Sequence, residues 1–135
     1  MRFALDASVT LCWCFRDEQS SLADQTFSLL QSGNEALVPV LWWFEIRNAI
    51  TQGIRKNRIN QNETAQFLER LSEMLIFIAP LPRTSAVLDL ALRHRLTFYD
   101  AAYLELAQRE GIALATLDQA LSRAATAEGV PLIGA

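Results

Sequence analysis

The sequence is poor in the residues that build most transition-metal sites. Its 135 residues include one histidine and two cysteines. Cys12 and Cys14 are two residues apart, and no second pair exists to complete the four ligands of a zinc site, so we expect two reduced, partly buried thiols. His94 alone cannot build a histidine-based metal site, and its place near an expected helix end favours a surface or helix-dipole role.

Long apolar segments are also lacking. The longest, residues 36–44, contains Pro39 and falls well short of the ~18 residues that a membrane-spanning helix needs. Asp6 stands where a signal peptide would have its apolar segment. We therefore expect no membrane span and no export by this route, which predicts a cytoplasmic protein.

Lysine is nearly missing: Lys56 stands against eleven arginines, and the net charge is −3. This charge argues against strong generic binding of nucleic acids, which depends on clustered cations. Residues 55–58 and 93–95 are basic, and each segment either contacts phosphates or is a solvated helix end. The dominance of arginine fits phosphate recognition slightly better, because its planar guanidinium binds oxyanions with two hydrogen bonds.

What the chain does have is enough apolar residues (51%) for a core, at a length that fits one domain over residues 1–135. Strands are expected at 2–6, 36–40, 75–79 and 112–117, with an edge strand at 130–133. Helices are expected at 7–14, 22–30, 41–56, 61–74, 87–92, 98–109 and 119–127. This alternation predicts a three-layer α/β/α fold with a mainly parallel central sheet and right-handed crossovers.

The expected helix 41–56 has two distinct faces. Its apolar residues are Leu41, Trp42, Phe44, Ile46, Ala49, Ile50 and Ile54. Glu45 and Asn48 share a polar stripe at helical spacing. We expect the apolar residues to pack in the core, and Trp43 is the aromatic residue left for a partner.

Four acidic residues lie where apolar segments give way to helix-like ones: Asp6, Glu45, Asp100 and Asp118. Ligand sites of open α/β sheets form outside the carboxyl ends of the strands, so we expect these carboxylates to meet. Each also has a structural explanation, since Asp at a helix start contributes roughly 0.5–2 kcal/mol. Their shared position weakens that explanation. Glu105, five residues after Asp100, lies off that helical face and is expected to be solvated.

Electrostatics then predicts a cation. Two carboxylates about 4 Å apart repel by roughly 4 kcal/mol at an effective dielectric constant of 20. Mg²⁺ and Mn²⁺ prefer oxygen ligands, and Mg²⁺ keeps several waters while binding one or two carboxylates directly. Such an ion makes a hydroxide nucleophile near neutral pH and offsets charge on a phosphoryl group. The acids therefore indicate metal-dependent hydrolysis of a phosphodiester.

Four motifs in this order resemble the PIN-domain ribonucleases, specifically the VapC-type toxins of bacterial and archaeal toxin–antitoxin modules. They are residues 3–8, 39–49, 97–107 and 115–121, and residues 129–132 resemble the ending of the family. The resemblance covers nearly the whole chain, and no acidic position of the pattern is missing.

This resemblance implies an endoribonuclease that depends on Mg²⁺ or Mn²⁺. Its acidic quartet would be Asp6, Glu45, Asp100 and Asp118. Thr116 would be an auxiliary polar group of the catalytic site, and Asn48 would orient Glu45. The resemblance also implies a homodimer and a small VapB-type antitoxin whose C-terminal segment covers the active site. The sequence does not indicate which RNA is cut.

Two other functions compete. An aspartyl-phosphate phosphohydrolase or receiver domain needs a lysine after a late strand, whereas Lys56 lies inside an expected helix, and residues 6–8 lack the second Asp of haloacid-type hydrolases. A non-catalytic α/β binding module would use the acids only to cap helices. Mg²⁺ or Mn²⁺ would neither stabilise such a module nor support RNA cleavage.

Overall fold

The structure, a computed structural model, describes residues 1–134. Its strands are β1 (Arg2–Leu5), β2 (Glu35–Val38), β3 (Ile76–Ile78) and β4 (Ala113–Ala115). Its helices are α1 (Ala7–Cys14), α2 (Ser21–Gln31), α3 (Val40–Arg55), α4 (Gln61–Ser72), α5 (Thr84–His94), α6 (Phe98–Glu110) and α7 (Gln119–Ala127). The predicted alternation of strands and helices is confirmed.

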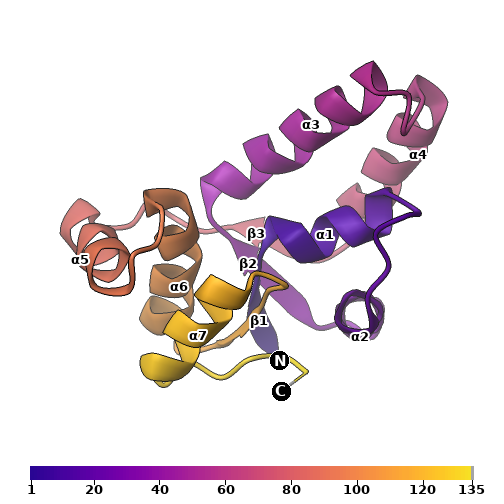
Figure 1. The fold of residues 1–135 in the computed structure, drawn as a ribbon. Helices are drawn as coiled ribbons and strands as arrows, with labels where there is room; N and C mark the ends of the chain where they lie inside the picture. The colour runs from indigo at the N-terminus through magenta and orange to yellow at the C-terminus, as the bar shows by residue number, and fades with distance from the viewer. Residues whose placement is uncertain (135) are drawn as a thin grey trace.

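The strands form one four-stranded sheet in the order β3-β2-β1-β4, with every pair parallel. Figure 1 shows α5, α6 and α7 to one side of the sheet and α1 and α2 to the other, while α3 and α4 project from it. The predicted α/β/α fold is therefore correct. The edge strand expected at residues 130–133 is reduced to one parallel bridge between Leu114 and Leu132.

The order of the strands determines where a ligand site can form. The chain runs outward from β1 through β2 to β3, and then crosses back to place β4 on the other side of β1. This reversal opens a crevice at the carboxyl ends of β1 and β4, the usual place for a ligand in such sheets. The Asp6 N–H donates to the Ala115 carbonyl at 3.0 Å, so the two strand ends lie side by side there.

Side-chain caps fix the ends of several helices. The Asn60 side chain accepts from the Glu63 N–H at 2.8 Å and Glu63 accepts from the Asn60 N–H at 3.1 Å, which completes a capping box at the start of α4. The Thr97 hydroxyl accepts from the Asp100 N–H at 3.0 Å and begins α6. Gly111, at φ 64°, ends α6 in the left-handed conformation that glycine adopts most easily.

Two expected exposures are wrong. Phe44 is 63% exposed, because α3 projects from the sheet and buries only a narrow stripe that includes Trp42 and Ile46. Glu105 is 4% exposed, and its carboxylate accepts from Arg109 Nε at 2.8 Å. The cause is that α6 buries every residue from 101 to 107, so no face of this stretch remains for solvent.

The remaining expectations about single residues are met in part. Cys12 and Cys14 are free and partly buried. Trp43 is 41% exposed, as expected. His94 is more than a surface residue, because its Nε2 lies 2.6 Å from the Glu128 carboxylate. No helix within residues 1–134 is long and apolar enough to cross a membrane.

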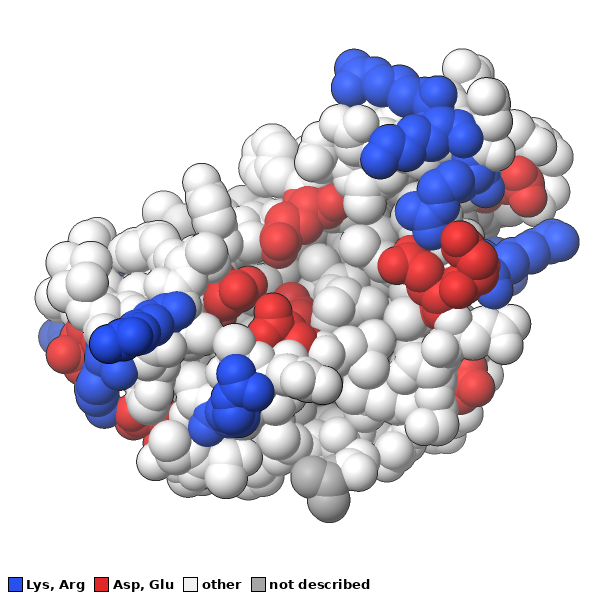
Figure 2. All heavy atoms as spheres, viewed as in Figure 1, with Lys and Arg blue, Asp and Glu red and all other residues white. Residues whose placement is uncertain are grey.

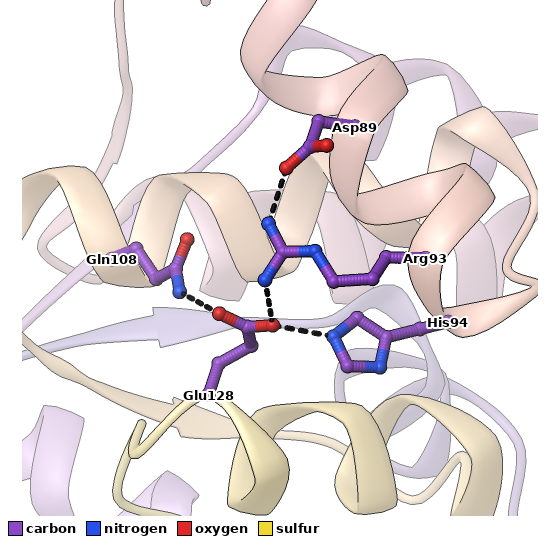
Figure 3. Close-up of polar contacts among 5 residues, drawn as sticks. All are labelled: Asp89, Arg93, His94, Gln108 and Glu128. Atoms are coloured by element: carbon purple, nitrogen blue, oxygen red, sulfur yellow. Dashed lines mark hydrogen bonds and ion pairs between the residues drawn. The ribbon is translucent and has the colours of Figure 1, made fainter.

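Glu128 joins three helices at the end of α7. Its carboxylate accepts from Arg93 Nη1 at 2.6 Å and from Gln108 Nε2 at 2.9 Å, and it contacts His94 (Figure 3). Arg93 also pairs with Asp89 one turn earlier on α5. These contacts fix the C-terminal end of α7 against α5 and α6. Asp118 and Asp100 lie at the opposite, N-terminal ends of α7 and α6.

Candidate active site

Asp6 follows β1 directly and is 6% exposed. Its Oδ2 accepts from the hydroxyls of Ser8 and Thr116, both at 2.7 Å. Burial raises the pKa of Asp6, the two hydroxyls lower it, and the charge of Asp100 raises it further. Asp6 is thus a fixed, buried acid with another carboxylate nearby.

The end of β4 contributes Thr116 and Asp118. The Thr116 hydroxyl accepts from the Asp118 N–H at 3.1 Å, in addition to its bond to Asp6. Asp118 Oδ1 accepts from the Leu121 N–H at 2.9 Å and caps α7. Ser8 Oγ accepts from the Leu117 N–H at 3.1 Å. These bonds join the ends of β1 and β4. They hold two of the predicted acids, Asp6 and Asp118, at adjacent strand ends.

Glu45 lies on α3, half-buried. The Tyr103 hydroxyl on α6 donates to Glu45 Oε1 at 2.5 Å. Burial raises the pKa of Glu45, the bond from Tyr103 lowers it, and the charges of Asp6 and Asp100 raise it. Within residues 1–134, the bond from Tyr103 is the side-chain hydrogen bond that orients Glu45. Asn48, expected in that role, is exposed.

Asp100 lies in the first turn of α6 and connects the set. Burial raises its pKa, the charge of Asp118 raises it further, and the bond involving Thr97 lowers it. Asp100 also acts on the pKa values of Asp6 and Glu45. All four predicted acids therefore interact through Asp100. Figure 2 shows acidic side chains around a hollow in the middle of this face, with basic side chains toward its two sides.

The donor set suits a hard divalent cation. All its donors are oxygens, and within residues 1–134 no lysine or arginine contributes to the pKa shifts of Asp6, Glu45 or Asp100. No three acidic, histidine or cysteine side chains of the described chain lie close enough together to form a ready metal site. Mg²⁺ needs only one or two direct carboxylates plus waters, and like charges without a cation repel, so the acids fit such an ion.

Two residues of the site were not assigned a role from the sequence. In the sequence, Ser8 is simply a residue near Asp6. In the structure, its hydroxyl donates to Asp6 after β1 and accepts from the Leu117 N–H after β4. Tyr103 is 58 residues from Glu45, so no local pattern links the pair. The sequence feature that could have pointed to Tyr103 is its position three residues after Asp100. Residues three apart lie on one face of a helix, so Tyr103 could be expected on the side that carries Asp100.

Comparison with known proteins gives the family. Residues 3–127 match the PIN domain model. Ribonuclease VapC3 of Pyrobaculum aerophilum is 30% identical over 125 residues, covering 90% of this chain and 93% of that protein.

Two solved structures share the fold. PAE2754 from Pyrobaculum aerophilum has a TM-score of 0.72 at 21% identity, over 92% of this chain and 84% of that one. VapBC2 from Rickettsia felis, bound to a DNA fragment from its promoter, has a TM-score of 0.67 at 15% identity, over 98% of this chain and 97% of that one. The chain therefore belongs to the PIN-domain family, among relatives of the VapC type.

Proposed function

We propose that this protein is a metal-dependent endoribonuclease, the toxin of a type II toxin–antitoxin system. The observation that carries the proposal is the placement of Asp6 and Asp118 at the hydrogen-bonded ends of β1 and β4, with Asp100 near enough to raise the pKa of Asp6 and Glu45. The 30% identity to Ribonuclease VapC3 supports RNA as the substrate. The acting unit is one PIN domain over residues 1–135.

The four acids would hold Mg²⁺ or Mn²⁺, some of them through water. Such an ion supplies a hydroxide near neutral pH and offsets the charge that builds on the scissile phosphate. The hydroxyls of Ser8 and Thr116 orient Asp6 and favour its ionised form, because they donate to the carboxylate. Thr116 therefore acts through Asp6 rather than on the substrate.

We further propose that the chain pairs with a VapB-type antitoxin in the cytoplasm and forms a homodimer. The similarity to VapBC2 supports the antitoxin. Exposed leucines support the homodimer: Leu88 and Leu92 lie one turn apart on α5 and are 45% and 73% exposed, and Leu81, just before α5, is 78% exposed. A monomer rarely leaves such an apolar surface open.

Cleavage of an RNA pool by the purified chain tests the activity. We expect cleavage with Mn²⁺ or Mg²⁺, none with excess EDTA, and a loss of at least about 100-fold in Asp6→Asn. Asp24→Asn is the control, since Asp24, like Asp6, lies near the start of a helix, but it is exposed and outside the site. No metal-dependent cleavage by the wild-type chain, with no change in Asp6→Asn, would favour the binding module, in which the acids only cap helices. Cleavage that is equal in Asp6→Asn and Asp24→Asn would contradict the role of Asp6.

A growth test addresses the toxin role. Expression of the chain alone should arrest growth, and co-expression of a small open reading frame adjacent to its gene should relieve the arrest. Growth that is unaffected by the wild-type chain would contradict the toxin proposal while leaving the nuclease assay to stand alone.

A further inference from the structure

Tyr103 is a buried tyrosine whose hydroxyl ends at the acidic site. Its side chain is 0% exposed and its ring belongs to the core. A phenol buried this deeply needs a partner for its O–H, because an unpaired buried donor is costly. The partner is Glu45 Oε1, at 2.5 Å.

This bond restrains a long, half-buried side chain of the site. Glu45 lies on the projecting helix α3, next to the exposed Phe44. A glutamate there has many rotamers, and ordering them has an entropic cost. Tyr103 cannot follow such motion, because its ring is enclosed by the core. The hydroxyl therefore fixes one carboxylate oxygen of Glu45 relative to α6.

The same helix also carries Asp100, three residues before Tyr103. Side chains at this spacing are neighbours on a helix surface. Asp6 lies nearby as well, since its charge raises the pKa of Tyr103. The backbone N–H of Ala7 lowers the pKa of both Tyr103 and Asp6. Through Tyr103, one rigid element thus determines where Glu45 stands relative to Asp6 and Asp100.

We propose that Tyr103 is a positioning residue that presents Glu45 to the divalent cation, the role that the sequence had suggested for Asn48. The inference rests on the proposed function. Tyr103 itself touches neither metal nor RNA; its hydroxyl donates to Glu45, which leaves the second oxygen, Oε2, for the cation or its waters. Residues that support metal ligands in this way typically change affinity or activity 10–100-fold when they are replaced.

Tyr103→Phe removes only the hydroxyl and tests the role. Tyr99→Phe is the control, because Tyr99 is the other tyrosine of the chain, one turn earlier on α6, and 65% exposed. We expect Tyr103→Phe to bind Mn²⁺ about 10-fold more weakly by calorimetry without RNA. RNA cleavage should lose kcat by a similar factor with an unchanged KM, whereas Tyr99→Phe keeps wild-type values.

A double-mutant cycle shows whether Tyr103 acts through Glu45. In a Glu45→Ala background, Tyr103→Phe should have no further effect on Mn²⁺ affinity or kcat. Wild-type Mn²⁺ affinity in Tyr103→Phe overturns the inference, and so does an equal effect in both backgrounds, which would indicate a structural role only. Failure of the wild-type chain to bind Mn²⁺ or cut RNA overturns the proposed function itself, and the inference with it.

Discussion

At the scale of single residues, the site concentrates negative charge, and this charge lowers the stability of the fold. The pKa values of Asp6, Glu45 and Asp100 are all raised, first by burial and then by neighbouring carboxylates. A raised pKa means that ionising the carboxyl group costs more free energy in the folded chain than in the unfolded chain, so the ionised group destabilises the fold. The divalent cation proposed for this site would offset this cost, so metal binding would raise stability.

The first prediction concerns pH. The unfolded chain releases these protons near the ordinary carboxyl pKa of about 4, and the folded chain releases them at higher pH. Between the two values the folded chain binds more protons, so the free energy of unfolding contributed by these groups falls as pH rises through that window. Thermal unfolding in EDTA, followed upward from about pH 4, should show this fall. Saturating Mn²⁺ should reduce it.

Asp100→Asn isolates the effect at one residue. It removes a partly buried charge that acts on the other acids, so at pH 7 in EDTA we expect a higher melting temperature. The increase should be no more than about 3 °C, because solvent screens a charge that is partly exposed. RNA cleavage should be lost. Asp24→Asn should leave both properties unchanged. A lower melting temperature for Asp100→Asn would show that this acid stabilises the fold.

Thr116 is the second residue-scale test. Its hydroxyl donates to Asp6 and accepts from the Asp118 N–H, so Thr116→Val breaks both bonds at constant shape. We expect a loss of about 1–3 kcal/mol in the free energy of unfolding, measured in urea. Cleavage should fall at least about 10-fold. Thr116→Ser keeps the hydroxyl and should retain most of both, and equal losses in Ser and Val would contradict the hydrogen-bond account.

At the scale of elements, the starts of helices could be predicted from the sequence, whereas the burial of their side chains could not. The helices that follow Asn60 and Thr97 have a local sequence signal, because a cap depends on residues within one turn, such as Asn60 and Glu63. Phe44 and Glu105 were placed wrongly because burial depends on what packs against a helix. A helical wheel shows which side chains share a face, but not that α6 is covered on all sides or that α3 projects.

Glu128 provides a test at this scale. Its carboxylate joins the end of α7 to Arg93 and His94 on α5 and to Gln108 on α6 (Figure 3). Because these contacts are partly exposed to solvent, we expect Glu128→Gln to lower the free energy of unfolding by only about 1 kcal/mol. Glu73→Gln is the control, since Glu73 also ends a helix but is exposed. Equal stability of the two variants would contradict the role of this cluster.

At the scale of the whole molecule, the sheet explains why Asp6 and Asp118 could be expected near each other. Asp6 and Asp118 come directly after or near the ends of β1 and β4, and parallel strands bring such ends to one edge. The partner of Glu45 could not be predicted, because Tyr103 lies 58 residues away on another helix and only the folded chain brings the two side chains together. Sequence thus located the acids, while the three-dimensional structure located what holds them.

The proposed homodimer is tested at the scale of the whole molecule. Leu88 and Leu92 share an exposed face of α5, so replacing both with glutamate should not disturb the core. If a second copy covers this face, the double variant should sediment as a monomer at concentrations where the wild-type chain is a dimer. A wild-type monomer, or a variant that remains a dimer, would contradict this placement of the interface.

Calorimetric titration of the metal-free chain with Mn²⁺, without RNA, tests most directly whether the four acids form a cation site. We predict saturable binding that Asp6→Asn abolishes and Asp24→Asn leaves intact. A hundredfold excess of Mn²⁺ over the dissociation constant should then add about 2.7 kcal/mol to the free energy of unfolding. Absence of binding to the wild-type chain, or binding that Asp6→Asn does not weaken, would contradict the account.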